Sequence, residues 1–204
     1  MRVLVGGGSG FVGRELTRLL TNKGHEVTVI SRQPGPGKIT WGELESSGLP
    51  ACEGAVNLAG ENLMNPFRWW NESYKKDLFS SRVACYKPSL TAQYTEDIVV
   101  RPGVVLGRDG GAMKQMLLPF WLGLGGTLGS GNQPFPWIHV SDLVGIIAHA
   151  LEPPADTPSP SPQVFNGVAP ALNTNYEFTK ELGRVMRRPT IFPVPGFVVN
   201  TLWR

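Results

Sequence analysis

The sequence predicts an α/β fold built on a doubly wound parallel sheet. Three observations carry this prediction: an apolar strand opens the chain, a run of glycines follows it, and an amphipathic helix then leads into a second strand. The first strand contains Val3, Leu4 and Val5, and the second spans 26–30. A strand, a helix and a strand in this order form a βαβ unit, whose two strands pair in parallel.

The glycines between the first strand and the helix are spaced for binding a dinucleotide. Gly7, Gly10 and Gly13 follow a Gly-x-x-Gly-x-x-Gly pattern, and Gly8, Gly10 and Gly13 also satisfy Gly-x-Gly-x-x-Gly. One glycine permits the tight turn, one lets backbone N–H groups approach a pyrophosphate, and one lets the helix pack closely on the strand. The helix N-terminus adds partial positive charge. The pattern therefore favours a Rossmann-type site over a glycine-rich turn without a ligand.

The end of the second strand indicates which dinucleotide is bound. A site that prefers NAD places Asp or Glu there, bonded to the ribose 2′-hydroxyl, whereas this chain has Ser31 and Arg32. Arg32 can pair with the extra phosphate of NADP through two hydrogen bonds, and Ser31 can donate another. We therefore predict NADP(H) as the cofactor. The alternative is that Arg32 is a solvated loop charge.

The following segments extend this sheet. Residues 54–59 are predicted as a buried strand ending at Gly60, and because ligands lie at the carboxyl ends of such strands, 57–60 should lie beside the dinucleotide. The other predicted elements are a short strand over 39–41, a short helix over 43–47, a helix over 71–82 with Asn71 as N-cap, a buried strand over 98–107 broken by Pro102, a helix over 113–122, an extended segment over 135–140, a helix capped by Ser141 and running to about Leu151, a short strand over 164–166, and a helix from Thr174 or Asn175 through Met186.

Composition is typical of a globular protein. The 204 residues are 41% hydrophobic and 17% charged, which is enough for one core with a small appendage. The net charge is +3 and the basic residues are scattered, so we expect no nucleic-acid partner. No run is apolar enough to span a membrane, and a strand at the N-terminus leaves no room for a signal peptide. We expect an intracellular, cytoplasmic location without membrane association; a mitochondrial location stays an alternative.

The cysteines and histidines give no sign of a metal site. Cys52 and Cys85 have neither metal-binding nor redox spacing, and we interpret both as free thiols of a reducing compartment. His25, His139 and His149 have no ligand spacing either. No bound metal is therefore expected.

Four segments in this order resemble the short-chain dehydrogenase/reductase superfamily, specifically its extended, sugar-epimerase-like members. They are the glycine loop, 57–60, 101–107 and 137–142. Within that superfamily, 60–66 and 134–139 resemble the atypical epimerase branch that is related to bacterial cell-division-inhibitor-like proteins. The resemblance covers nearly all of the chain. It implies an NADP-dependent oxidoreductase or nucleotide-sugar-epimerase-like protein that transfers a hydride to or from an unidentified small-molecule substrate.

The resemblance also implies which residues hold the cofactor. Asp77 and Arg82, on the helix after the strand at 54–59, match positions that face the nucleotide, although the branch more usually has Glu at the first of them. Arg101 would lie near the nicotinamide, and an equally weighted alternative places it in a buried ion pair. The predicted cofactor-binding residues are Gly7, Gly10, Phe11, Val12, Gly13, Ser31, Arg32, Leu58, Ala59, Gly60, Asp77, Arg82 and Arg101.

One interval departs from the superfamily pattern. Members carry a further central strand and a helix with Tyr-x-x-x-Lys before the Arg-Pro strand, and this Tyr is the general acid/base. Here only 83–97 occupies the interval, and neither Tyr86 nor Tyr94 has a Lys four residues later. Tyr176 and Lys180 have the spacing but come too late in the chain, so we interpret them as a packing tyrosine and a solvated lysine. The catalytic residues are left unassigned.

We therefore expect a Rossmann-type sheet that lacks one central strand–helix unit. Residues 1–151 would form the NADP-binding domain with an internal deletion near 83–97, 152–162 a proline-rich loop, and 163–204 a truncated substrate-side region. Two functions stay open: an NADP-dependent enzyme, or a non-catalytic NADP(H)-binding or redox-sensing module, including an inactive splice isoform. A homodimer also stays open.

Overall fold

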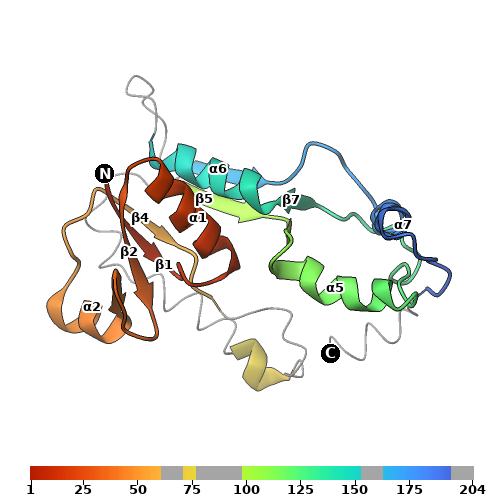
Figure 1. The fold of residues 1–204 in the computed structure, drawn as a ribbon, viewed down its shortest axis with the longest axis horizontal. Helices are drawn as coiled ribbons and strands as arrows, with labels where there is room; N and C mark the ends of the chain where they lie inside the picture. Colours follow the sequence, from red (N-terminus) through yellow and green to blue (C-terminus); the bar gives the residue numbers. More distant parts are fainter. Residues whose placement is uncertain (61–70, 77–97, 153–162, 194–204) are drawn as a thin grey trace. The chain divides into compact units, whose positions relative to one another are not determined.

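The structure is a computed structural model that describes residues 1–60, 71–76, 98–152 and 163–193 (Figure 1). Two compact units divide the chain. The first comprises Met1–Leu63, Lys76–Arg101 and Val140–Phe165, and the second comprises Met64–Lys75, Pro102–His139 and Asn166–Arg204. The three-part organisation predicted from the sequence stays a prediction.

A four-stranded parallel sheet forms the centre of the first unit. Its strands are β1 (Arg2–Gly6), β2 (Glu26–Ser31), β3 (Lys38–Thr40) and β4 (Gly54–Asn57), in the order β3-β2-β1-β4. In register, Gly6 at the end of β1 stands opposite Ile30 of β2 and Asn57 of β4. A parallel sheet in which the strand order reverses beside β1 confirms the predicted α/β class, and its carboxyl edge is where such sheets bind ligands.

The first βαβ unit supplies the core of this unit. α1 (Phe11–Asn22) packs on β1, and its Leu16 and Leu20 are 0% and 1% exposed. α1 ends as predicted before Gly24, whose φ is +85°. The helix α6 (Val140–Leu151) lies beside α1 (Figure 1) and buries Leu143, Val144, Ile147 and Ala148.

The predicted start of α6 is wrong by two positions. The strand β7 (Trp137–His139) runs directly into the helix, whose first residue is Val140, so Ser141 lies inside the first turn and is not the N-cap. Asp142 lies in that first turn as predicted. A predicted cap needs a residue outside the helix, and here no loop residue separates strand from helix.

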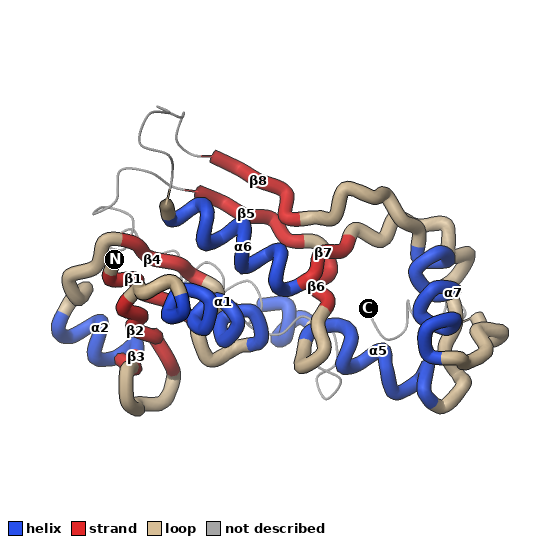
Figure 2. Tube along the Cα trace, turned by 45° about the horizontal axis from the view of Figure 1, so that its top comes forward, coloured by secondary structure: helices blue, strands red, loops and turns tan. Residues whose placement is uncertain are grey.

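The remaining strands of the first unit are less buried than the sequence predicts. β5 (Ile98–Pro102) pairs with β8 (Gln163–Gly167) in a separate two-stranded sheet, visible in Figure 2. The prediction of buried strands over 54–59 and 98–107 is wrong in this respect, since Ala55, Asn57 and Val99 are exposed. Among the strands that the structure describes, β4 pairs with β1 alone and β5 with β8 alone, so each leaves an edge without a described partner.

The second unit contains the parallel pair β6 (Val104–Leu106) and β7, with the helices α5 (Gly111–Trp121) and α7 (Asn175–Met186). Thr174 caps α7: its side chain accepts a hydrogen bond from Glu177 N, and the Glu177 carboxylate accepts one from Thr174 N. This confirms the predicted start of the last helix. The rings of Phe135 and Phe178 stack with centroids 4.3 Å apart.

Several predicted features concern short or undescribed segments. Asn71 Oδ1 accepts a hydrogen bond from Tyr74 N at 2.8 Å, which confirms Asn71 as the cap of a helix whose described part covers 72–76. Cys52 forms no disulfide bond with any residue that the structure describes. In the described ranges no helix is both long and apolar enough to cross a membrane. The predictions for Asp77, Arg82, Cys85, 83–97, 153–162 and 197–204 fall outside the described residues.

Candidate cofactor site

The glycine loop between β1 and α1 makes a tight turn that only glycine allows. Gly7 has φ of +73°, in the left-handed region. A Cβ on Gly7 would stand 2.8 Å from Ala59 N and 2.8 Å from the carbonyl carbon of Leu58. The turn therefore lies directly against the residues that follow β4, which brings together two of the predicted cofactor-binding segments.

Gly13 and Gly8 allow close packing around the loop, and Gly10 lies on its open side. A Cβ on Gly13 would stand 2.3 Å from Gly7 O and 2.6 Å from Gly8 Cα, so Gly13 lets α1 pack on the turn. A Cβ on Gly8 would meet both methyl groups of Val29 on β2 at 2.8 Å. Gly10 is exposed, and a Cβ there would meet only Gly7 O, at 3.2 Å. Gly10 thus leaves the open side of the loop to a ligand.

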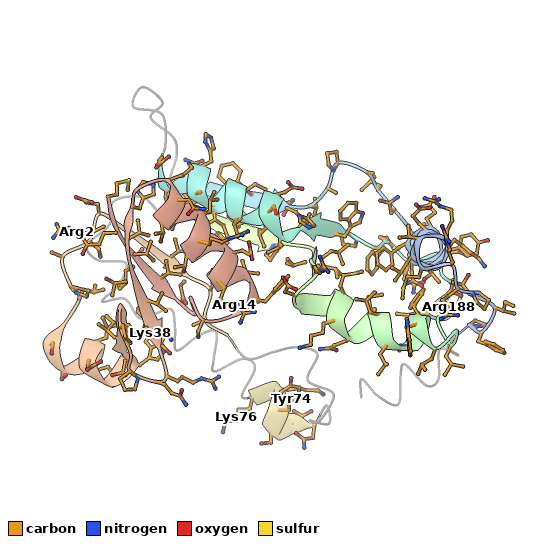
Figure 3. The ribbon with its side chains drawn as sticks, in the orientation of Figure 1. Arg2, Arg14, Lys38, Tyr74, Lys76 and Arg188 are labelled. Carbon is orange, nitrogen blue, oxygen red and sulfur yellow. The ribbon has the colours of Figure 1, made fainter. Side chains whose placement is uncertain are left out.

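The N-terminus of α1 is arranged to accept an anion. Its N-cap is Gly10, which has no side chain to bond the first-turn N–H groups, and the first turn contains no acidic residue. Those N–H groups belong to the predicted residues Phe11, Val12 and Gly13. Arg14 Nη1 donates a hydrogen bond to Ser9 O at 3.2 Å, which places its guanidinium beside the loop (Figure 3). A pyrophosphate bound here would meet backbone donors and positive charge together.

The carboxyl end of β2 presents a cation. Ser31 is buried, and its Oγ accepts a hydrogen bond from Gln33 N at 3.2 Å, which leaves the hydroxyl proton to donate. Arg32 is exposed. The next carboxylate along the chain, Glu43, accepts hydrogen bonds from Thr40 N and Thr40 Oγ1, and these bonds lower the pKa of Glu43. The end of β2 itself therefore carries a cation and no acidic residue, as a 2′-phosphate requires.

The carboxyl end of β4 forms the other wall. Asn57 Oδ1 accepts a hydrogen bond from Ala59 N at 3.0 Å, which fixes the turn that places Leu58 and Ala59 against Gly7. Leu58 and Ala59 are half-buried, and Gly60 is exposed. These positions agree with the predicted placement of 57–60 at the carboxyl edge of the sheet.

Sequence reasoning missed Trp41, the first residue of α2 (Trp41–Ser47). Its Cη2 atom lies 3.7 Å from the point where a Cβ on Gly6 would stand, at the end of β1. The available signal was an aromatic residue at the end of the predicted third strand, which the structure places instead at the first position of α2. The reach of its side chain across β2 is a tertiary feature that the pattern does not contain.

The structure also describes Arg101 and the Tyr-x-x-x-Lys pair of Tyr176 and Lys180. Arg101 is exposed on β5, so the alternative of a buried ion pair is wrong; its place near the nicotinamide stays a prediction. In the second unit, Lys180 Nζ donates to Thr190 Oγ1 at 3.0 Å and lies 5.5 Å from the centre of the Tyr176 ring. Tyr176 is 50% exposed. This geometry gives Lys180 a structural role on α7.

A pocket and the search for a metal-binding cluster concern residues outside this site. A pocket of about 270 Å³ lies at the amino ends of β1 and β2, the opposite end of the strands from the glycine loop. Its lining residues are Arg2, Val3, Leu4, Glu26, Thr28, Pro50, Ala51 and Cys52. The described part of the chain contains no group of three or more His, Cys, Asp or Glu side chains that could hold a metal ion.

Comparison with known proteins places these features in a family. The NAD dependent epimerase/dehydratase family matches residues 3–53, which hold the glycine loop and Arg32. The human epimerase family protein SDR39U1 is 47% identical over 258 positions, covering 100% of this chain and 86% of the human protein. A crystal structure of human SDR39U1 (isoform 2) with NADPH matches with a TM-score of 0.90 and 43% identity, covering 100% of this chain and 86% of that one.

A more distant structure shares the fold alone. UDP-N-acetylglucosamine 4-epimerase from Bacillus cereus matches with a TM-score of 0.65 and 14% identity, covering 97% of this chain and 87% of that one. The Rossmann-type fold predicted from the glycine pattern is therefore confirmed.

The alignment with the human relative also shows that this chain is shorter internally. All 204 residues are aligned over 258 positions, so at least 54 positions hold a residue of the relative and none of this chain. The sequence predicts that a strand–helix unit is missing near 83–97. That position stays a prediction, because 83–97 lies outside the described residues.

Proposed function

The chain belongs to the epimerase family, and we propose that it binds NADP(H) at the carboxyl edge of the β3-β2-β1-β4 sheet. Two features together carry this proposal. The N-cap Gly10 gives the first-turn N–H groups of α1 no capping side chain, and an exposed Arg32 stands where an NAD site has an acidic residue. The relative that was crystallised with NADPH supports it, at 43% identity over the whole of this chain.

The residues present fit the two charged groups of the cofactor. The first-turn N–H groups of α1 and Arg14 would hold the pyrophosphate, and Arg32 with the Ser31 hydroxyl would hold the 2′-phosphate. The nicotinamide supplies hydride chemistry when the cofactor is bound. We propose that the protein uses it as an NADP-dependent oxidoreductase or nucleotide-sugar-epimerase-like enzyme on a small-molecule substrate, in the cytoplasm.

A second candidate is a non-catalytic NADP(H)-binding or redox-sensing module. The sequence favours it, because neither Tyr86 nor Tyr94 has a Lys four residues later. In the later Tyr-x-x-x-Lys of α7, the ammonium of Lys180 is bonded to Thr190. The internally shorter chain favours it as well. Consumption of NADPH with a panel of carbonyl compounds and nucleotide sugars separates the two: turnover supports the enzyme, and binding without turnover supports the module.

Thermal unfolding in the presence of NADPH, and separately of NADH, tests the binding proposal. A ligand that binds only the folded state at about a hundred times its Kd stabilises that state by about 2.7 kcal/mol. We expect NADPH to raise the unfolding midpoint clearly and NADH to raise it little. The absence of a shift with NADPH would refute the proposal.

The substitution Arg32→Ala tests the specificity of the site. Charge-assisted hydrogen bonds contribute roughly 1.5–3 kcal/mol, so Arg32→Ala should weaken NADPH binding by about one to two orders of magnitude and NADH binding much less. Lys38→Ala is the matched control, because Lys38 is an exposed cation at the start of β3, opposite Val29 (Figure 3). An equal loss for both dinucleotides would contradict the assignment of Arg32 to the 2′-phosphate.

A further inference from the structure

Trp41 lies beside the carboxyl end of β2, where the 2′-phosphate of the cofactor is proposed to bind. In NADP the 2′-phosphate and the adenine are carried by the same ribose, so a base whose 2′-phosphate meets Arg32 must lie close to the end of β2. Thr40 pairs with Ser31 at that end, and Trp41 is the next residue. The first turn of α2 therefore begins beside the proposed phosphate site.

The start of α2 is fixed by its own hydrogen bonds. Thr40 Oγ1 accepts a hydrogen bond from Glu43 N at 3.2 Å, and the Glu43 carboxylate accepts one from Thr40 N at 2.6 Å. This capping box determines where the helix begins, and hence the direction in which the Trp41 side chain leaves the backbone. The backbone at Trp41 is therefore held in place without a ligand.

The indole extends over the carboxyl edge of the sheet. Its Cη2 atom lies 3.7 Å from the point where a Cβ on Gly6 would stand, and Asn57 Oδ1 lies 3.1 Å from the same point. Because β2 lies between β3 and β1, the ring crosses the end of β2 to reach β1. Trp41 and the turn after β4 thus approach each other over Gly6.

The exposure of Trp41 distinguishes it from the core of this sheet. Leu4 and Ile30, on β1 and β2, are 1% and 3% exposed, whereas Trp41 is half-buried. Part of the Trp41 side chain is therefore accessible to a ligand. A partly open indole between a cation-bearing strand end and the apolar Leu58 and Ala59 presents a surface suited to a flat heteroaromatic base.

We propose that the indole of Trp41 is the platform on which the adenine base of NADP(H) stacks. This inference rests on the proposed function, because it assumes that the dinucleotide lies at this edge of the sheet. It adds a residue that determines affinity for the adenosine half independently of the phosphate contacts of Arg32.

The variants Trp41→Leu and Trp41→Phe test this inference by direct binding measurements. The probes are NADPH, adenosine 2′,5′-bisphosphate, which lacks the nicotinamide, and reduced nicotinamide mononucleotide, which lacks the adenine. Trp41→Leu should weaken the first two by about 5- to 150-fold and leave the third unchanged. Trp41→Phe should retain most of the affinity, because a phenyl ring still stacks. Trp121→Leu is the control, since Trp121 is 61% exposed on α5 in the second unit.

Indole fluorescence gives a readout that a packing role would not change. Stacking of adenine on Trp41 should quench part of the tryptophan emission when adenosine 2′,5′-bisphosphate binds. We expect this quenching in the wild type and in Trp121→Leu, and its loss in Trp41→Phe at saturating ligand.

The outcomes separate this inference from the proposed function. A wild-type chain that binds neither NADPH nor adenosine 2′,5′-bisphosphate would refute both. A wild type that binds them, together with a Trp41→Leu variant that binds them equally well, would refute the stacking role alone. A lower thermal midpoint in that variant without any change in affinity would assign Trp41 to packing.

Discussion

The strands β1 and β5 are both short and rich in valine, but they differ in burial and in the number of strands that pair with them. In β1, Val3, Leu4 and Val5 are 2%, 1% and 0% exposed. In β5, no residue is buried, and Val99 is 37% exposed. β1 has a partner strand on each side and is covered by α1, whereas β5 is paired in the described part of the chain only with β8.

The comparison shows that a strand of this composition is buried only when its neighbours are present. Strands of parallel sheets are normally covered on both faces and flanked on both sides. The β5–β8 pair instead exposes Val164 and Phe165 at 49% and 43%. Relatives carry at least 54 positions that this chain lacks, and a missing strand–helix unit beside β4 would leave β5 in this state.

The largest expected effect comes from truncating one apolar side chain in each region. Leu16→Ala removes a fully buried side chain of α1 and should cost about 2–5 kcal/mol of unfolding free energy. Val99→Ala removes a side chain that is already 37% exposed and should cost less than about 1 kcal/mol. Chemical denaturation of both variants measures the difference.

Equal costs for Leu16→Ala and Val99→Ala would break the comparison. They would mean that β5 is buried in solution by something other than β8, and a second copy of the chain is the first occupant to examine. Sedimentation of the wild type and of Val99→Ala would then show whether the cost at Val99 depends on self-association.

A smaller effect is expected from adding one methyl group to a glycine. Gly13→Ala places a Cβ 2.3 Å from Gly7 O, so α1 must move away from the turn at Gly7 and Gly8 at a cost of roughly 1–3 kcal/mol. Gly145→Ala is the control, because Gly145 is exposed on α6 and its Cβ would meet nothing within 4 Å. That substitution should stabilise the helix by about 0.5–1 kcal/mol. If Gly13→Ala and Gly145→Ala both destabilise the protein, the cost at Gly13 does not come from its close packing against the turn.

The sequence predicted the features that depend on local geometry. The glycine loop, the stop at Gly24 and the cap at Thr174 are all present, because each follows from backbone conformation or hydrogen bonds within a few residues. Which of the overlapping glycines at Gly7 and Gly8 makes the turn could not be read from spacing. The structure assigns the turn to Gly7 and the contact with Val29 to Gly8.

The features that the sequence could not predict depend on distant neighbours. An apolar run such as 98–100 looks the same whether or not a strand lies beside it, so its exposure follows from partners elsewhere in the chain. The reach of Trp41 to Gly6 depends on the strand order β3-β2-β1, which no local pattern contains. Residues 83–97, which the sequence singles out as the unusual interval, lie outside the described residues.

Besides burial and strand pairing, ionic contacts at the end of α6 distinguish the region around β1 from the β5–β8 pair. Glu152, directly after α6, lies 2.7 Å from His25 Nε2 and 3.3 Å from Lys23 Nζ. These two residues lie between α1 and β2, so the contacts connect α6 to the βαβ unit. The hydrogen bond from Lys23, followed by the charges of Lys23 and His25, lowers the pKa of Glu152 from its ordinary value of 4.5.

The smallest expected effect is therefore a pH-dependent one at Glu152. Because its pKa is lower in the folded state than in the unfolded state, the ionised carboxylate stabilises the fold above pH 4.5, and this contribution is lost as pH falls through the lowered pKa. Glu152→Gln should lower the thermal midpoint slightly near pH 6, and the difference from wild type should shrink as pH falls through the lowered pKa of Glu152 and vanish below it. A difference that persists unchanged to low pH would mean that Glu152 holds α6 by packing alone, and that the charge adds nothing to the stability of the better-buried region.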